Sequence, residues 1–175
     1  LAMTLENHWS NTVFNLICEQ DISIVSFVPD AGLSQLIDLC VAYESIQTVR
    51  LTSEEEGVAL AMGTWLGGKK SLLLMQSSGV GNCINMLSML NTCQVPLPMM
   101  VTMRGDWGEF NPWQVPMGQG TENVLKEMGV TTFRAQENDE VAKCAEGAIR
   151  FAFNTYRPTA VLIDQRVLGA KTFGR

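Results

Sequence analysis

Three consecutive glutamates, Glu54, Glu55 and Glu56, open a segment that is otherwise apolar and rich in small residues. Successive residues of a helix are rotated by about 100°, so the three side chains cannot point the same way. Glu54 shares a helical face with Val58 and Ala61, at spacings of four and seven. A carboxyl group on an apolar face loses water, which favours its protonated form and suits it to proton transfer. The alternative is that the glutamates only complement the helix dipole.

A second candidate is the junction Gln76-Ser77-Ser78-Gly79-Val80-Gly81-Asn82, which follows the apolar run 71–75. Its glycines would let a ligand approach the backbone closely, and the start of a helix offers free N–H groups. The junction lacks the lysine of a P-loop and the third glycine of a dinucleotide fingerprint. An ordinary tight turn is therefore the alternative to a binding loop.

Polar residues also follow other β-rich runs. Asp30 comes directly after Pro29 at the end of one run, and Arg104 stands at the end of another. Asp30 could cap the next helix or face a ligand. Arg104 could bind an anion, or pair with Asp106 or Glu109.

Strand-like and helix-like segments alternate along the chain. Strands are predicted at 22–28, 46–51, 71–75, 97–103, 130–134 and 159–163. Helices are predicted at 7–20, 33–43, 54–66, after Gly79 as far as Thr92, 121–128 and 138–153. A long loop, 104–120, and a polar tail, 165–175, complete the chain.

This alternation predicts an α/β fold with three α/β/α layers around a mostly parallel six-stranded sheet. Residues 1–175 would form a single domain, with 165–175 as a C-terminal tail. Ligands of such sheets bind beyond the carboxyl ends of the strands. The polar residues that follow strands should therefore share one rim: Pro29, Asp30, Glu54, Gln76, Ser77, Ser78 and Arg104.

Composition excludes several classes of function. The chain has 175 residues, of which 46% are hydrophobic, and a formal charge of −6. Without a basic run it is a poor partner for nucleic acid, and its uncharged runs are too interrupted for a membrane span. The N-terminus has no signal-peptide layout. Five cysteines without a CxxC pair, with His8 as the single histidine, give no support for a metal site and favour reduced thiols in a cytoplasmic protein.

Together these motifs resemble the pyrimidine-binding domain of thiamine-diphosphate enzymes, in particular the family of sulfopyruvate decarboxylase α subunits, with phosphonopyruvate decarboxylases as near relatives. The likeness rests on the segments 52–58 and 75–82, and on Gly63, nine positions after Glu54. Shorter matches are Val28-Pro29-Asp30, Arg104-Gly105 and Val115-Pro116-Met117-Gly118. The order and spacing of the pieces, more than any single piece, make the set specific.

The resemblance implies that the chain holds the pyrimidine end of thiamine diphosphate. Glu54 would hydrogen-bond the aminopyrimidine and promote the proton transfer that prepares the cofactor to attack a 2-oxo acid. Glu55 and Glu56 would be bystanders or intersubunit contacts. The residues implied on the pyrimidine side are Ser77, Ser78, Gly79 and Asn82. The residues implied on the substrate side are Pro29, Asp30, Gln76 and Arg104.

The family's pyrophosphate-binding half has no match in this chain. Its Gly-Asp-Gly pattern is broken at Gly105-Asp106-Trp107, and no Asn pair follows. The resemblance therefore implies a β subunit that carries the pyrophosphate-binding domain and Mg²⁺, and no metal site on this chain. The uncharged helices 57–66 and 82–92 also suggest self-association or contact with that subunit.

The expected activity is that of a carboxy-lyase that works only with its partner and converts sulfopyruvate to sulfoacetaldehyde and CO₂ in sulfonate or coenzyme M metabolism. Two alternatives stay open. One is a phosphonopyruvate decarboxylase component, although those enzymes normally carry both halves on one chain. They also tend to have a His in the loop after their Arg-Gly, where this chain has Trp113, Gln114 and Val115. The other is a non-catalytic assembly or regulatory subunit.

Overall fold

The apolar runs of the sequence form the centre of a parallel sheet in the computed structural model, which describes residues 8–169. Strands β3 (Lys70–Gln76), β4 (Leu97–Thr102) and β6 (Pro158–Ile163) are covered on both faces, so their sequences show no polar alternation. β1 (Ile22–Phe27) lies beside β3, while β2 (Gln47–Arg50) and β5 (Thr131–Ala135) form the edges. The order is β2-β1-β3-β4-β6-β5 with every pairing parallel, which confirms the predicted α/β fold.

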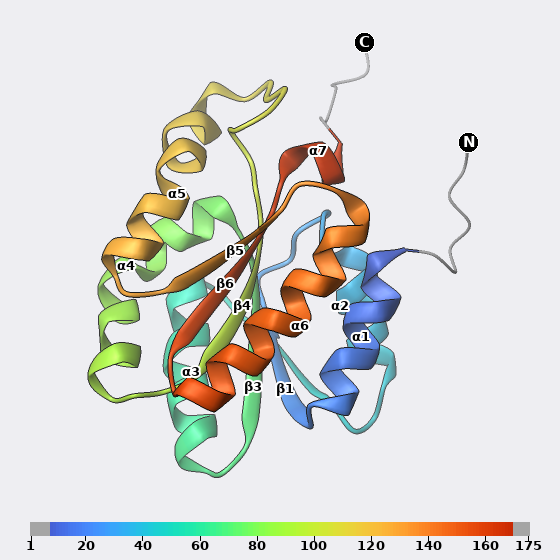
Figure 1. The fold of residues 1–175 in the computed structure, drawn as a ribbon, viewed down its shortest axis with the longest axis vertical. Helices are drawn as coiled ribbons and strands as arrows, with labels where there is room; N and C mark the ends of the chain where they lie inside the picture. The colour runs from blue at the N-terminus through green and yellow to red at the C-terminus, as the bar shows by residue number, and fades with distance from the viewer. Residues whose placement is uncertain (1–7, 170–175) are drawn as a thin grey trace.

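Helices cover both faces of the sheet (Figure 1). α1 (Trp9–Glu19), α2 (Ser34–Ala42) and α6 (Asn138–Thr155) pack on one face. α3 (Glu54–Leu66), α4 (Ser77–Thr92) and α5 (Val115–Glu127) pack on the other. Successive strand residues point to opposite faces, so Leu72 and Leu74 join the first core cluster while Leu73 and Met75 join the second.

Most boundaries lie within two residues of the prediction, but two helices begin earlier than predicted. α4 starts at Ser77, so the Ser-Ser-Gly segment is the first turn of the helix and not a separate loop. A 3₁₀ helix, η2 (Pro112–Gln114), leads into α5 at Val115, within the predicted loop. Pro116 is compatible with this start because N–H groups in the first turn have no intrahelical partner.

The predicted C-terminal tail is in part a structured element. Its first residues form α7 (Gln165–Leu168), and Gln165 is only 2% exposed. Asp164 caps this short helix by accepting a hydrogen bond of 3.0 Å from the N–H of Arg166. Residues 170–175 of the tail, like the predicted helix start at Asn7, lie outside the described range.

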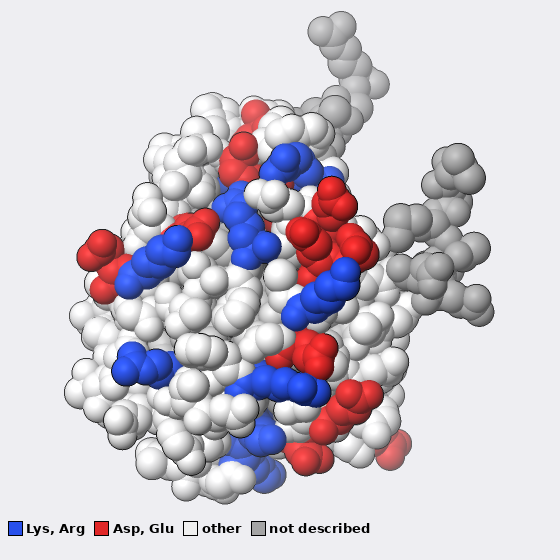
Figure 2. Space-filling view, in the orientation of Figure 1, with Lys and Arg blue, Asp and Glu red and all other residues white. Residues whose placement is uncertain are grey.

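The strand order reverses between β1 and β3 and again between β4 and β6. Crossovers leave such points toward opposite faces, and the crevice at the carboxyl ends of the strands is the usual ligand site. Over the face in Figure 2, acidic and basic side chains are interspersed without a continuous basic stripe. Within residues 8–169, no helix combines the length and apolar character needed to cross a membrane.

Candidate active site

The three glutamates diverge as helix geometry requires. Glu54 turns inward at the start of α3 and is 8% exposed. Glu55 accepts a hydrogen bond from the hydroxyl of Ser53, which lowers the pKa of the Glu55 carboxyl group. Glu56 folds back to accept a hydrogen bond of 2.9 Å from the N–H of Thr52. Only the first of the three carboxylates is buried against the rest of the domain.

Helix α4 supplies the surroundings of the Glu54 carboxyl group. The amide of Asn82 donates a hydrogen bond of 2.8 Å to Oε2 of Glu54. Gly79 lies against the same carboxyl group, and a Cβ atom at Gly79 would overlap it. Burial, and then the nearby charges of Glu54 and Glu55, raise the pKa of Cys83 to about 12, so that Cys83 remains a neutral thiol. The structure thus brings together three predicted site residues, Glu54, Gly79 and Asn82.

A polar network runs along the carboxyl ends of β1, β3 and β4. Ser78 Oγ donates to Gln76 Oε1 over 2.9 Å, and Gln76 Nε2 donates to Asp30 Oδ1 over 2.9 Å. Asp30 Oδ2 accepts from Thr102 Oγ1 over 2.9 Å. Helix α2 begins without a side-chain cap, so Asp30 serves as a rim residue and not as its N-cap. Pro29 lies exposed beside this network.

Ser77 and Arg104 are engaged with the chain itself. Ser77 is fully buried, and its Oγ accepts a hydrogen bond of 3.0 Å from the Arg104 N–H. The Arg104 guanidinium makes two hydrogen bonds to Glu109, from Nε (2.6 Å) and Nη2 (2.5 Å). These bonds hold the pKa of Glu109 down to about 2. Asp106, the other predicted partner, pairs with Arg134 instead.

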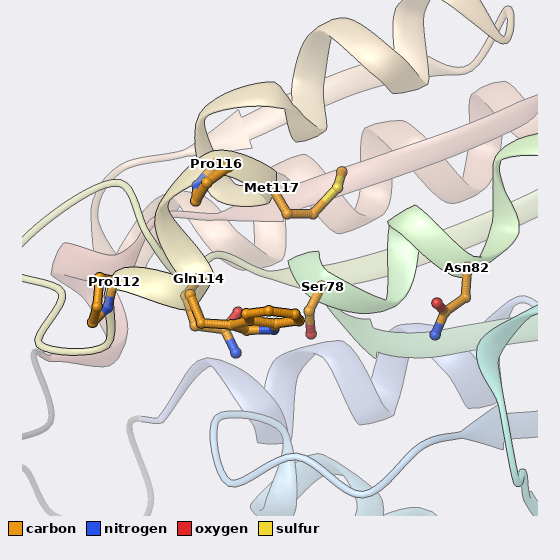
Figure 3. Close-up of a pocket in the computed structure, with 7 residues that line it drawn as sticks. Ser78, Asn82, Pro112, Gln114, Pro116 and Met117 are labelled. Atoms are coloured by element: carbon orange, nitrogen blue, oxygen red, sulfur yellow. The ribbon is translucent and has the colours of Figure 1, made fainter.

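Two pockets are lined by some of the predicted site residues: Ser78 and Asn82 line one, and Asp30 and Arg104 line the other. The remaining predicted residues line neither of these pockets: Pro29, Glu54, Gln76, Ser77 and Gly79. The larger, of about 670 Å³, lies beside the Glu54–Asn82 pair, and Figure 3 shows Ser78 and Asn82 on one side with Gln114 and Met117 on the other. Its lining residues are Ser78, Asn82, Pro112, Trp113, Gln114, Pro116 and Met117. The smaller, of about 100 Å³, includes Asp30, Thr102, Arg104, Gln165 and Leu168 in its lining. Among residues 8–169, no group of three or more His, Cys, Asp or Glu side chains could hold a metal ion.

Sequence reasoning gave no ligand-facing role to the wall formed by Trp113, Gln114 and Met117. These residues lie in the segment read as an irregular loop, and their place depends on the early start of α5. A usable signal was present, because exposed aromatic side chains gather in this stretch: Trp107 is 50%, Phe110 40% and Trp113 82% exposed.

No family model matches the chain. Individual relatives do. The α subunit of sulfopyruvate decarboxylase from Methanococcus maripaludis is 34% identical over 156 residues, which cover 89% of this chain and 93% of the relative. The chain belongs to the family of sulfopyruvate decarboxylase α subunits.

Other relatives are longer than this chain. A sulfopyruvate decarboxylase from Methanosarcina acetivorans is 33% identical over 89% of this chain, but the match covers only 40% of that longer protein. A phosphonopyruvate decarboxylase from Streptomyces viridochromogenes is 34% identical over 59% of this chain and 27% of its own length.

Among solved structures, benzoylformate decarboxylase from Polynucleobacter necessarius superposes on the chain with a TM-score of 0.75. The superposition covers 97% of this chain and 32% of that protein, at 16% identity. At that identity the likeness shows a shared fold, and the α subunit family described above is the closer assignment in sequence.

Proposed function

We propose that the chain is the α subunit of a thiamine-diphosphate-dependent decarboxylase that converts sulfopyruvate to sulfoacetaldehyde and CO₂. The observation that carries the proposal is the Glu54 carboxyl group, which is buried at the start of α3, held by Asn82 and placed beside an open pocket. Membership of the α subunit family supports the same function, since the relatives carry this name.

The residues present fit the pyrimidine end of the cofactor. Among the hydrogen bonds of residues 8–169, Glu54 accepts one, at Oε2, and its Oε1 lies against Gly79. Gly79 has no side chain between the two helices, and Ser78 and Asn82 open onto the pocket. These four residues, Glu54, Ser78, Gly79 and Asn82, would hold the pyrimidine, while buried Ser77 would support them by fixing the backbone at Arg104.

When bound, thiamine diphosphate supplies the electron sink for the carbanion that forms as a 2-oxo acid loses CO₂. The chain's own task is to hold and pass a proton at Glu54. Its burial at the start of α3 and the hydrogen bond from the Asn82 amide fix the position of this carboxyl group, as proton transfer to a bound group requires.

We infer that a β subunit completes the site. The Gly-Asp-Gly pattern of the family's pyrophosphate-binding half is broken at Gly105-Asp106-Trp107, which supports a metal and diphosphate site on the partner. The longer sulfopyruvate decarboxylase of M. acetivorans and the name "subunit alpha" among the relatives support a divided enzyme. Self-association and a cytoplasmic location are further parts of this proposal, the latter supported by five free cysteines.

The positive charge that an anionic substrate needs is not freely offered by Arg104. Its guanidinium group is 13% exposed and paired with Glu109. We therefore propose that cationic groups of the β subunit recognise much of the sulfonate and carboxylate charge. Asp30 and Gln76 remain substrate-side candidates through their place on the rim, beside the exposed Pro29.

The deciding experiment measures CO₂ release from sulfopyruvate, with Mg²⁺ and thiamine diphosphate, by the chain alone, by the β subunit alone and by the mixture. Activity confined to the mixture is the expected result. Activity of the chain alone would contradict the divided site. Preference for phosphonopyruvate over sulfopyruvate in the mixture would replace the proposed substrate with the near relative's, and a mixture inactive on both acids would favour a non-catalytic subunit.

A further inference from the structure

Glu109 lies at the centre of the loop that joins β4 to η2, and hydrogen bonds hold its side chain in place. Its side chain is 3% exposed. Besides the two bonds from Arg104, it accepts hydrogen bonds from the N–H groups of Gly105 (3.1 Å) and Asn111 (3.0 Å). A carboxylate with charge-assisted bonds to both ends of a short loop fixes that loop in one conformation.

Gln165 reaches the same loop from the end of β6, the strand beside β4. It lies at the start of α7, 56 positions further along the chain, and donates a hydrogen bond of 2.9 Å to Glu109 Oε2. Its Oε1 accepts from the N–H groups of Asp106 (3.3 Å) and Trp107 (3.1 Å). The two buried side chains thus accept hydrogen bonds from four backbone N–H groups of the loop, those of residues 105, 106, 107 and 111.

The loop in turn sets the position of the pocket wall. Gly105 adopts a φ of +79°, and a Cβ atom there would overlap the carbonyl of Gln114. A Cβ atom on Gly118 would overlap the carbonyl of Arg104, and Gln119 Nε2 donates to the carbonyl of Gly105 over 3.0 Å. The backbone of the 104–111 loop is therefore in contact with the backbone at the start of α5. A displacement of this loop must displace Gln114 and its neighbours.

We propose that Glu109 and Gln165 are positioning residues that fix the wall of the larger pocket opposite Ser78 and Asn82. Neither residue hydrogen-bonds Glu54 or lines the larger pocket, and both act through the 104–111 loop. The identity of the ligand bound in the larger pocket rests on the proposed function. The ordering of the loop by Glu109 and Gln165 does not depend on that function. In this arrangement Glu109 is required for tight binding of substrate and cofactor and is separate from the proton transfer at Glu54.

The opposite role for Glu109 makes a different prediction. If Arg104 were a binding group for the substrate anion, Glu109 would compete with the substrate, and its neutralisation would strengthen binding. The positioning role requires that neutralisation weakens binding, because the loop loses the acceptor that orders it.

The test compares Glu109→Gln and Gln165→Leu with the wild-type chain and with Asp139→Asn. Asp139 is a matched acidic control, because it forms an exposed pair with Lys143 on α6. Hydrogen–deuterium exchange of the isolated full chain is measured first. We expect amide exchange over 105–120 to rise about tenfold or more in both variants, with β3 and β4 unchanged and the control like wild type. Unchanged exchange over 105–120 would overturn the proposal.

Steady-state kinetics of the complex with the β subunit supply the second readout. The KM for the 2-oxo acid and the Kd for thiamine diphosphate should rise about tenfold in both variants, with kcat within about threefold of wild type. A lowered KM in Glu109→Gln would show that Arg104 is an anion site and overturn the positioning role. If wild-type complex decarboxylates no 2-oxo acid, the proposed function fails while the exchange data still decide the loop's role. If Glu109→Gln does not fold, Gln165→Leu carries both measurements.

Discussion

Gly79 lies so close to Glu54 that one methyl group on its Cα would overlap the carboxyl group. Glycine inside a helix costs about 1 kcal/mol relative to alanine, so its presence in the first turn of α4 calls for a reason. The reason is the approach of α3 to α4, which brings the Glu54 carboxyl group within reach of the Asn82 amide.

Gly79→Ala should therefore disturb the site more than the fold. The added methyl group forces Glu54 out of its position, and we expect decarboxylase activity of the complex to fall by at least about 100-fold, with a loss of about 1–3 kcal/mol in the free energy of unfolding. Gly147→Ala, in α6 on the other face of the sheet, is the control, because a Cβ atom there meets Phe133 at an ordinary contact distance of 3.6 Å. The control should keep activity and gain about 0.5–1 kcal/mol in urea unfolding. Equal activities of the two variants would show that the Gly79 contact is unimportant.

Glu54→Gln should abolish most of the activity while leaving the fold intact. Glutamine keeps the shape and can still meet Asn82, but it cannot hold and release a proton. We expect kcat to fall by at least about 100-fold in the complex, with little change in the affinity for the β subunit. Glu55→Gln is the control, because Glu55 is the neighbouring residue and its carboxyl group accepts a hydrogen bond from Ser53. The kcat of this variant should stay within about twofold of wild type. A Glu54→Gln complex with near wild-type kcat would favour the non-catalytic reading.

Acid should destabilise the folded chain, because it protonates two carboxylates at the rim. Bonds from Arg104 hold the pKa of Glu109 near 2, against a usual 4.5. Burial alone would raise the pKa of Asp164, but hydrogen bonds from Arg166 and Arg134 lower it to about 2, against a usual 3.8. Groups with depressed pKa values in the folded state stabilise it fully above their unfolded pKa and progressively less as the pH falls toward 2.

We expect each group to contribute about 1–2 kcal/mol at pH 7, lost mainly between about pH 5 and 2. Asp106 acts in the opposite sense, because burial and the nearby Asp164 raise its pKa, so its protonation favours the folded state and offsets part of the loss. Urea unfolding at pH 7, 5, 4 and 3 measures the slope. Glu109→Gln should flatten it, and Asp139→Asn should not. Parallel curves for all three proteins would refute this assignment.

Trp113 should contribute to assembly with the β subunit. It is 82% exposed at the edge of the larger pocket, where the proposed partner would close the site. Trp113→Ala should weaken the affinity for the β subunit by at least about tenfold without changing the Tm of the isolated chain. Val41→Ala, 58% exposed on α2, is the control and should leave the affinity unchanged. An unchanged affinity in Trp113→Ala would place the subunit contact elsewhere.

The fold was largely predictable because long apolar runs mark strands that are buried on both faces. The start of α5 was not, since Pro116 and Gly118 are typical helix breakers when considered alone. In the structure Pro116 sits in the first turn, and Gly118 is required by the carbonyl of Arg104. Both facts depend on contacts between segments, which local propensity does not contain.

The site was predictable only where local geometry decides it. Helix rotation alone predicts that Glu54 diverges from its two neighbours. Local sequence does not decide whether Arg104 binds an anion or pairs with Glu109, nor whether Gln165 belongs to a tail or to a buried network. Both outcomes depend on how separate crossover segments pack together at the rim. The role of Gly79 likewise depends on the distance between two helices.

The insertion of β6 between β4 and β5 affects how the protein is made. During synthesis on the ribosome, β4 is complete about 60 residues before β6 can pair with it, so the nascent chain carries an open, apolar strand edge for that interval. Gln165 lies two residues beyond the end of β6, so the loop held by Glu109 acquires its last hydrogen bonds only after that edge is covered. The pocket wall should therefore be the last part of the domain to mature.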